Sequence, residues 1–384
     1  MIDHIKGNIV FVSSHPIQYQ VPIFKKLAKK KKFYVIFKNK IKKSTILFDK
    51  EFNKKIVWGK NLQTGYKFIS FDKYKSYTQN FLYIYRFFKK KKIKFLILSG
   101  WNSNFYRTII IISKILNIKI VLRCENNLDN KRGFFKFIKI ISLFLFFKIF
   151  YKFLAIGKKN LDMYLKCGVD PKKIYKTPYC VDENFFSEKK INKLKLNKIK
   201  KKIGVKQKKV FLFVGKLIER KGFEDLQNIS ILIKNNHKIY KKLIFLIIGT
   251  GEKLEKFKKF IKNNKIDNFK FLGFKNQKEL IYYYKLSNFL ILPSRYETWG
   301  LVVNEAMSLG TPCIVSNNCG CANDLVIKNK NGFVYKEGNY FNLFKIIKNT
   351  FSKNFEYDKM KKLTHKKIKK FTIDQTVEKI LKIK

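Results

Sequence analysis

The chain has 384 residues, which is long enough for two domains with separate cores. Its hydrophobic content of 46% and aromatic content of 16% exclude a disordered chain. Lysine and arginine outnumber aspartate and glutamate by 85 to 26, a formal net charge of +59 that suggests nucleic acid or an anionic membrane as partner. Because the excess is mostly lysine and runs through every segment, we interpret much of it as a compositional bias and expect no specific nucleic acid partner. The charge should still attract anionic lipid.

The six cysteines show no disulfide framework. Only Cys319 and Cys321 are close, and their Cys-Gly-Cys spacing is not that of a zinc site. Buried free thiols in a reducing compartment are expected. The first residues lack the pattern of a signal peptide, so we expect a cytoplasmic location.

The first half of the chain alternates predicted strands and helices. Asn8–Ser13 is a predicted strand and Val21–Lys30 a predicted helix, with a polar turn between them that contains His15. Ligand contacts of doubly wound folds lie at the carboxyl end of the first strand, so His15 is either a substrate contact or simply a turn residue. Further strands are predicted at Phe33–Phe37, Phe68–Phe71, Lys94–Ser99 and Lys119–Arg123, with helices at Asn80–Phe88 and Asn104–Leu116.

A long aromatic stretch follows at Phe134–Leu154. Its longest uncharged run, Ile140–Phe147, is too short for a membrane-spanning helix. The alternatives are a core helix and a basic, aromatic helix lying on a bilayer surface. We favour partial core packing with an exposed rim that touches the membrane, because the lysines point in different directions along a helix: Lys136, Lys139, Lys148 and Lys152.

The predicted boundaries divide the chain into three parts. A first domain covers residues 1–180, a lysine-rich and weakly periodic linker covers 181–208, and a second domain covers 209–367. In the second domain, predicted strands alternate with helices, which indicates a parallel sheet: Lys209–Val214, Leu243–Ile248, Asn268–Leu272 and Phe289–Leu292. Residues 368–384 contain a last predicted helix.

The most informative stretch is Leu290–Ser316, which is typical of a strand, a polar loop, a short helix and a second strand. Glu297 lies in the loop, and Glu305 follows eight positions later in the helix. Between them, Thr298 to Leu301 would present backbone N–H groups at the helix N-terminus, which is a favourable place for binding a phosphate. A carboxylate at such a place is a good acceptor for sugar and ribose hydroxyls.

This strand–loop–helix–strand unit, with seven residues between its two glutamates, resembles the donor-site signature of family 4 glycosyltransferases. The turn around His15 resembles the HPIQ-type opening of one branch of that family. The resemblance implies the GT-B fold class: two doubly wound, Rossmann-like α/β domains with parallel sheets facing a cleft. The first domain would bind the acceptor and the second the nucleotide sugar, with helix 368–384 crossing back onto the first.

The resemblance also implies residue roles. The loop from Gly215 to Gly222 matches the family loop whose Arg and Lys hold the diphosphate, with Lys216 in the place of the Arg and Lys221 in that of the Lys. Glu305 would bind the ribose, and Glu297 the donor sugar or leaving group. Where many members carry a histidine near the reacting sugar, this chain has Glu125. The candidate catalytic residues are Lys216, Lys221, Glu297 and Glu305, and the candidate substrate-binding residues are His15, Glu125, Gly215, Gly249, Gly251, Gly273, Thr298, Trp299, Gly300 and Leu301.

The implied function is a retaining glycosyltransferase that moves a sugar from a nucleotide sugar to a lipid-linked or polysaccharide acceptor. Its product would belong to a surface glycan such as lipopolysaccharide, capsule or exopolysaccharide. No metal or other cofactor is implied, because cationic side chains supply the positive charge. The protein would be cytoplasmic and attached peripherally to the inner face of the plasma membrane. The alternatives are a catalytically weak GT-B scaffold and a basic nucleic-acid-binding protein.

Overall fold

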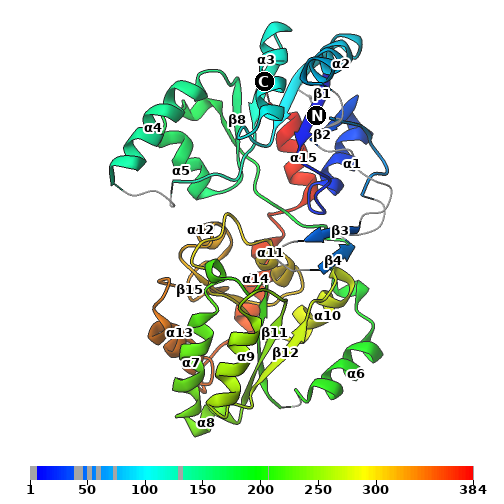
Figure 1. The fold of residues 1–384 in the computed structure, drawn as a ribbon. Helices are drawn as coiled ribbons and strands as arrows, with labels where there is room; N and C mark the ends of the chain where they lie inside the picture. Colours follow the sequence, from blue (N-terminus) through cyan, green and yellow to red (C-terminus); the bar gives the residue numbers. More distant parts are fainter. Residues whose placement is uncertain are drawn as a thin grey trace. The chain divides into compact units, whose positions relative to one another are not determined.

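The structure, a computed structural model, describes residues 7–38, 46–49, 54–57, 62–71, 76–128, 133–205 and 207–383. The chain forms two compact units (Figure 1). Unit 1 comprises Met1–Phe48, Lys55–Cys180 and Ile373–Lys384, and unit 2 comprises Asp49–Lys54 and Val181–Thr372. The region predicted to be a linker, 181–208, lies in unit 2 and contains the helix α6 (Lys193–Ile203). A two-stranded sheet of β3 (Ile46–Asp49) and β4 (Lys54–Val57) completes the strands described here.

Unit 1 is built on a seven-stranded sheet with strand order β5-β2-β1-β6-β7-β8-β9, in which every pair is parallel. Its strands are β1 (Asn8–Ser13), β2 (Phe33–Phe37), β5 (Lys67–Ser70), β6 (Ile93–Leu98), β7 (Lys119–Leu122), β8 (Lys152–Ala155) and β9 (Ile174–Lys176). Its helices are α1 (Val21–Lys30), α2 (Tyr77–Lys90), α3 (Asn104–Ile115), α4 (Gly133–Phe147), α5 (Lys158–Lys166) and α15 (Ile373–Leu381).

Local signals explain most of these elements. The central strand β1 is apolar and buried almost throughout, as expected of a parallel strand covered on both faces. The helix α2 begins three residues before the predicted start because Ser76 caps it: the Ser76 hydroxyl accepts from the backbone N–H of Gln79, whose side chain accepts from the N–H of Ser76.

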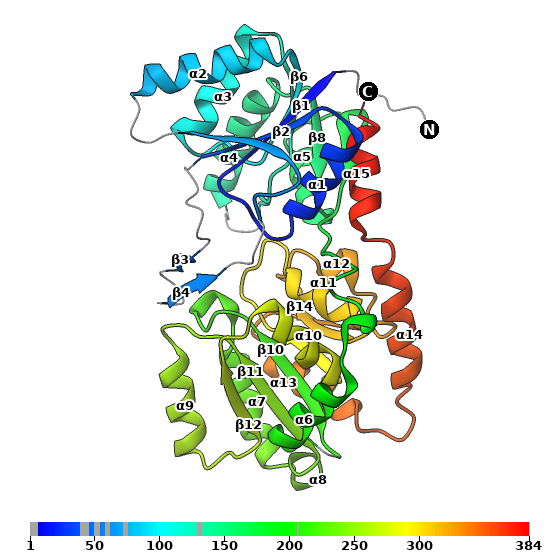
Figure 2. The same ribbon diagram turned by 90° about the vertical axis from the view of Figure 1, so that its right-hand side faces the viewer.

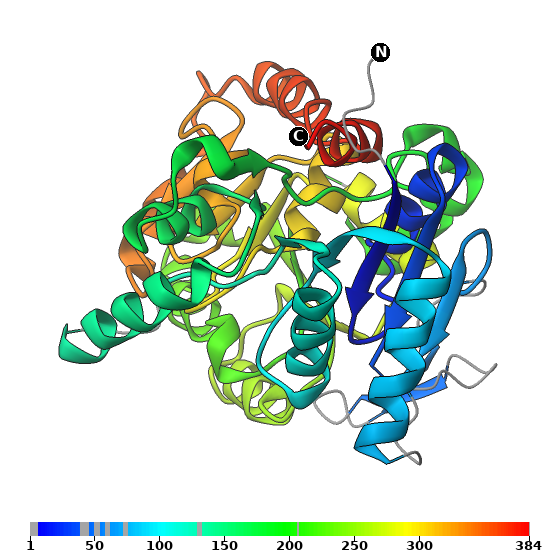
Figure 3. The same cartoon turned by 90° about the horizontal axis from the view of Figure 1, so that it is seen from above.

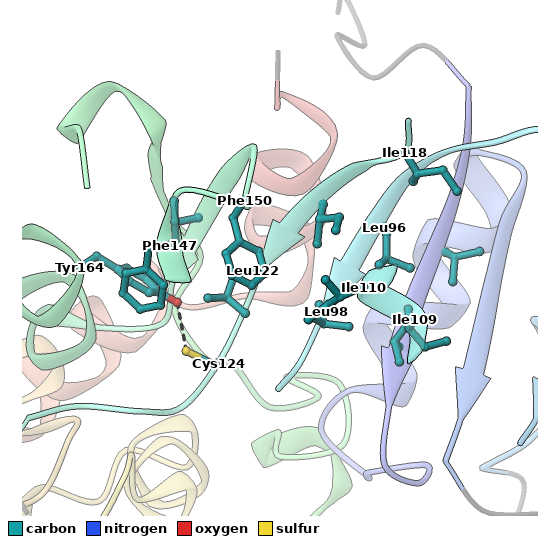
Figure 4. Close-up of a cluster of buried hydrophobic side chains, with 14 of the residues drawn as sticks. Leu96, Leu98, Ile109, Ile110, Ile118, Leu122, Cys124, Phe147, Phe150 and Tyr164 are labelled. Atoms are coloured by element: carbon teal, nitrogen blue, oxygen red, sulfur yellow. Dashed lines mark hydrogen bonds between the residues drawn. The ribbon is translucent and has the colours of Figure 1, made fainter. Parts of the chain in front are cut away.

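The aromatic stretch 134–154 is not one continuous helix. The helix α4 ends at Phe147, and β8 begins at Lys152, where it pairs with β7. Leu143 and Phe147 are buried, and the Phe147 ring lies 5.6 Å from that of Tyr164 (Figure 4). Partial core packing is therefore confirmed for this segment.

Unit 2 is built on a six-stranded, parallel sheet with strand order β12-β11-β10-β13-β14-β15. Its strands are β10 (Lys209–Val214), β11 (Leu243–Ile248), β12 (Phe269–Gly273), β13 (Phe289–Leu292), β14 (Cys313–Ser316) and β15 (Gly332–Tyr335). Its helices, besides α6, are α7 (Glu224–Lys234), α8 (His237–Tyr240), α9 (Leu254–Asn263), α10 (Gln277–Leu286), α11 (Leu301–Ser308), α12 (Ala322–Leu325), α13 (Tyr340–Asn349) and α14 (Tyr357–Ile368).

The chain ends in unit 1. After α14, the helix α15 lies along α1 (Figure 2). Val377, Ile380 and Leu381 of α15 are buried in the same core cluster as Phe24 of α1. The last helix thus completes the core of a unit whose other strands and helices come from the first half of the chain.

Candidate active site

Two loops of unit 2 meet at one edge of its sheet. The strands β10 and β13 are parallel neighbours, so the loops that follow them, Gly215–Gly222 and Pro293–Gly300, leave the same edge. The backbone N–H of Arg295 donates to the carbonyl of Arg220 at 2.9 Å and joins the two loops directly. Predicted site residues from distant parts of the sequence therefore meet where open α/β sheets bind ligands.

The predicted glycines Gly215, Gly249, Gly251 and Gly273 lie at the carboxyl ends of β10, β11 and β12. Gly249 has φ +138°, and a Cβ atom there would lie 1.8 Å from the carbonyl oxygen of Gly215. A Cβ on Gly251 would similarly lie 2.5 Å from the carbonyl oxygen of Leu217. The loops after β10 and β11 thus touch backbone to backbone, which explains why glycines stand there.

Lys221 and Glu297 form an ion pair between the two loops, Nζ to Oε2. Their side chains are only 13% and 12% exposed. The Lys221 stem lies against Gly215, whose added Cβ would be 3.9 Å from Lys221 Cε. Limited exposure makes such a pair stronger than one on an open surface. The site therefore holds a fixed cation beside the carboxylate of the two-glutamate motif. Lys216, in the same loop, is half-buried.

The loop that carries Glu297 is held by the segment after β14. The N–H of Gly320 donates to the Glu297 carbonyl, and the N–H of Cys321 to the Trp299 carbonyl, both at 2.9 Å. The Trp299 ring is buried, and its Nε1 donates to Asn304 Oδ1 at 2.8 Å. The Trp299 side chain therefore stabilises the start of α11.

The helix α11 begins directly after this loop, with Gly300 as its N-cap at φ +99°. The first N–H groups of an α-helix have no acceptor within the helix and carry partial positive charge. In α11 these groups follow Thr298 and Trp299 and begin at Leu301. The start of α11 is thus suited to an anion beside Lys221.

Glu305 lies one turn further along α11. It is 8% exposed, and its Oε2 accepts a hydrogen bond from the Tyr284 hydroxyl at 2.6 Å. Burial raises the pKa of Glu305 to about 7, and hydrogen bonds from Tyr284 and Gln277 act in the opposite direction. The carboxyl therefore changes protonation near neutral pH, unlike an exposed glutamate.

Sequence reasoning missed the residues that support these loops. The Arg295 guanidinium bridges Asp225 at 3.0 Å and Glu337 at 3.1 Å, and the Tyr335 hydroxyl donates to Asp225 Oδ2 at 2.8 Å. Asp225 is fully buried at the start of α7. One signal in the sequence could have indicated this role: Asp225 lies on the mostly apolar face of a predicted helix. A carboxylate buried there needs a cationic partner.

Two predicted residues lie in unit 1. His15 stands in the turn between β1 and α1, where its Nδ1 is 2.9 Å from the Ser14 hydroxyl. Partial desolvation lowers the pKa of His15 from its usual value, although the side chain is exposed. Both a turn role and a substrate contact agree with this position.

Glu125, after β7, belongs to a partly buried polar cluster that the sequence did not reveal. Its Oε1 accepts hydrogen bonds from the hydroxyls of Tyr19, at 2.8 Å, and Tyr179. The Arg123 guanidinium lies 4.8 Å from the centre of the Tyr179 ring. Burial raises the pKa of Tyr19 and Tyr179, which keeps both as donors. Glu125 therefore ties the turn after β1 to the chain after β9.

Residues 196–369 match the family described as "Glycosyl transferases group 1". Over these residues, which make up most of unit 2, the chain resembles this family. The matched range contains Lys216, Lys221, Glu297 and Glu305, so the predicted resemblance is confirmed in the unit that holds them. Among the described residues, no group of three or more His, Cys, Asp and Glu side chains is arranged to hold a metal ion.

Several members resemble parts of the chain. An uncharacterised glycosyltransferase of Methanocaldococcus jannaschii is 34% identical over 144 residues, which cover 36% of this chain and 34% of the relative. The UDP-Gal:alpha-D-GlcNAc-diphosphoundecaprenol alpha-1,3-galactosyltransferase of Escherichia coli is 34% identical over 171 residues, 43% of this chain and 42% of that one. The chain thus spans about a third of the length of the first curated relatives it matches.

The fold of nearly the whole chain is similar to that of solved structures. The Anabaena protein HepE, solved in complex with UDP-glucose, has a TM-score of 0.70 at 15% identity, covering 98% of this chain and 99% of HepE. The predicted GT-B fold class, with two parallel α/β units, is therefore confirmed.

Proposed function

We propose that the protein is a retaining glycosyltransferase that moves a sugar from a nucleotide-diphosphate donor to a lipid-linked or polysaccharide acceptor. The observation that carries this proposal is the Lys221–Glu297 pair beside the start of α11, at the carboxyl edge of the unit 2 sheet. The product would be part of a surface glycan. No metal or other cofactor is required in this proposal.

The chemistry needs positive charge where the diphosphate leaves. Departure of the sugar builds negative charge on that group, and preorganised cations and N–H donors stabilise it. Lys221, Lys216 and the first N–H groups of α11 are suited to this task. A bound diphosphate would compete with Glu297 for Lys221, and the released Glu297 carboxylate would then accept hydrogen bonds from the donor sugar. The half-protonated Glu305 would accept the ribose hydroxyls.

Relatives support a uridine donor and a lipid-linked acceptor. HepE is solved with UDP-glucose, and the Escherichia coli relative is named for UDP-Gal and a diphosphoundecaprenol acceptor. We assign donor binding to unit 2 and acceptor binding to unit 1, where His15 and the Glu125 cluster lie at strand ends. A lipid-linked acceptor places the protein on the inner face of the plasma membrane as a cytoplasmic, peripheral enzyme.

The test measures nucleotide release from a panel of UDP- and GDP-sugars with lipid-linked acceptors. We expect turnover with at least one donor, and a loss of about a hundredfold or more in Lys221→Ala and Glu305→Ala. Lys258→Ala, which removes an exposed lysine paired with Glu255, should keep the wild-type rate.

A catalytically weak scaffold is the second candidate, favoured by Lys216, because an ammonium lacks the two-pronged geometry of the arginine that the family carries there. Donors that raise the melting temperature without any turnover would support the scaffold. Absence of both effects would contradict both candidates.

A further inference from the structure

The helix α4 exposes an unusual amount of apolar surface. Sixteen large apolar side chains are exposed in the described parts of the chain, and seven of them lie on α4, with exposed fractions between 42% and 72%. These seven, which we name the α4 apolar face, are Phe134, Phe135, Phe137, Ile138, Ile141, Phe144 and Leu145.

The opposite side of α4 holds the helix on unit 1. Leu143 and Phe147 are buried, and the Phe147 ring lies 6.1 Å from that of Trp101. Lys139 also turns inward, where its Nζ donates to the Asn127 carbonyl at 3.3 Å. Among the α4 residues whose burial is described, Ser142 is the one exposed polar side chain. The helix thus has apolar side chains on both its inner and its outer side, and the outer ones are exposed.

The contacts with unit 1 explain why the inner side of α4 is apolar, but they do not explain the apolar residues on its outer side. The helix lies at the outer edge of unit 1 beside α5 (Figures 1 and 3). Soluble monomers rarely expose contiguous apolar patches above a few hundred Å², and larger ones mark surfaces that bind something. Aromatic and branched aliphatic residues without charges form the face of a helix that enters the headgroup region of a bilayer.

The surroundings of this face carry positive charge. Lys148 is exposed, and its Nζ lies 4.7 Å from the centre of the Phe144 ring at the margin of the face. Lys158 and Lys166 are exposed on the neighbouring α5. From residue 133 to 169 the sequence has one acidic residue, Asp162. An anionic partner is therefore favoured, and pairing of two copies is disfavoured by a charge of +59 on each.

We propose that the α4 apolar face docks the protein on an anionic phospholipid bilayer. The apolar side chains would enter the boundary between headgroups and acyl chains, and Lys148 would lie at the level of the lipid phosphates. None of the described helices is long and apolar enough to cross a bilayer, so this contact would be interfacial. The proposal holds whichever sugar the protein transfers.

The test is co-sedimentation of the full chain with vesicles of phosphatidylglycerol and phosphatidylcholine. The variant Phe135→Gln/Phe137→Gln/Leu145→Gln replaces three exposed apolar side chains by a good helix former. We expect it to partition at least about tenfold more weakly than the wild type. A matched control, Leu82→Gln/Ile111→Gln/Ile115→Gln, changes three exposed apolar residues on α2 and α3 and should bind within about twofold of the wild type.

A second measurement distinguishes insertion from adsorption. The variant Phe137→Trp should show a blue-shifted additional fluorescence, relative to the wild type, when anionic vesicles are added. The same emission with and without vesicles would overturn the proposal.

Two further outcomes would also overturn it. The α4 variant could bind vesicles as tightly as the wild type, which would assign binding to lysines spread over the surface. Alternatively, the wild type could form a dimer that the α4 variant loses, without binding vesicles. Nucleotide-dependent melting of each variant, measured without lipid, shows whether it is folded and keeps failure of this proposal separate from failure of the enzymatic one.

Discussion

Glu305 shows at the scale of one residue how burial changes chemistry. Its folded pKa is raised from 4.5 to about 7 by burial. Between these values the folded chain holds a proton that the unfolded chain releases, so stability falls as the pH rises from about 4.5 to 7 and is constant above. In the wild type this group should lower the free energy of unfolding by about 3 kcal/mol over that pH range, and we expect Glu305→Gln to abolish the decrease. Urea denaturation at pH 5 and pH 8 measures it.

The comparison with Glu305→Gln isolates this group from others whose pKa is also raised by burial, such as Asp225. Glu255→Gln, at an exposed position, should keep the wild-type pH dependence. An equal decline in the wild type and Glu305→Gln would contradict the assignment.

At the scale of elements, the contact between the loops after β10 and β11 depends on Gly249. We expect Gly249→Ala to destabilise unit 2 by about 3 kcal/mol or more, because its Cβ would lie 1.8 Å from the Gly215 carbonyl at φ +138°. Gly273→Ala is the matched control: its φ is +65°, but no atom lies within 4 Å of the added Cβ. Gly273→Ala should lower the free energy of unfolding by about 1 kcal/mol. Chemical denaturation compares them, and equal losses would disprove the role of backbone contact.

Arg295 links three elements around the buried Asp225. Arg295→Met would leave that carboxylate without its cation, and we expect a loss of about 2 kcal/mol, less than for a fully buried pair because Arg295 is 31% exposed. Adding Asp225→Asn should restore part of the loss, since a neutral amide needs no counter-ion. Denaturation of both single variants and the double variant measures the coupling. Purely additive losses would mean that the pair does not support the loop.

At the scale of the whole molecule, unit 1 is completed by the end of the chain. Val377 and Ile380 of α15 are almost fully buried. We expect Val377→Ala/Ile380→Ala to destabilise unit 1 by about 4 kcal/mol or more while nucleotide binding by unit 2 persists. Asp374→Ala, which removes an exposed ion pair with Lys26, should change stability by less than about 1 kcal/mol. Calorimetry with and without nucleotide follows the units separately, and a parallel loss of nucleotide binding would contradict this division.

Sequence alone was sufficient for many of the elements and for the resemblance to the family, but it did not predict β15, α13 or α14. The apolar runs of β1, β10 and β11 and the glutamate spacing of Leu290–Ser316 are local patterns, and local patterns determine strands, helices and loop types. Element ends were less certain: the start of α2 depends on its Ser76 cap, and α4 ends where β8 joins the sheet.

Tertiary structure alone decided which side chains meet. Lys221 and Glu297 are 76 positions apart, and Asp225 and Tyr335 are 110 apart, so no local pattern could pair them. The hydrogen bonds that oppose the raised pKa of Glu305 come from Tyr284 and Gln277 of α10, a separate element. The lysines in the 134–154 stretch suggested no single basic face. In the structure Phe147 packs against Trp101 and Lys139 turns inward, while four other phenylalanines of α4 are exposed: Phe134, Phe135, Phe137 and Phe144. Parallel strands bring distant loops to one edge of a sheet, and that edge determines which charges face each other.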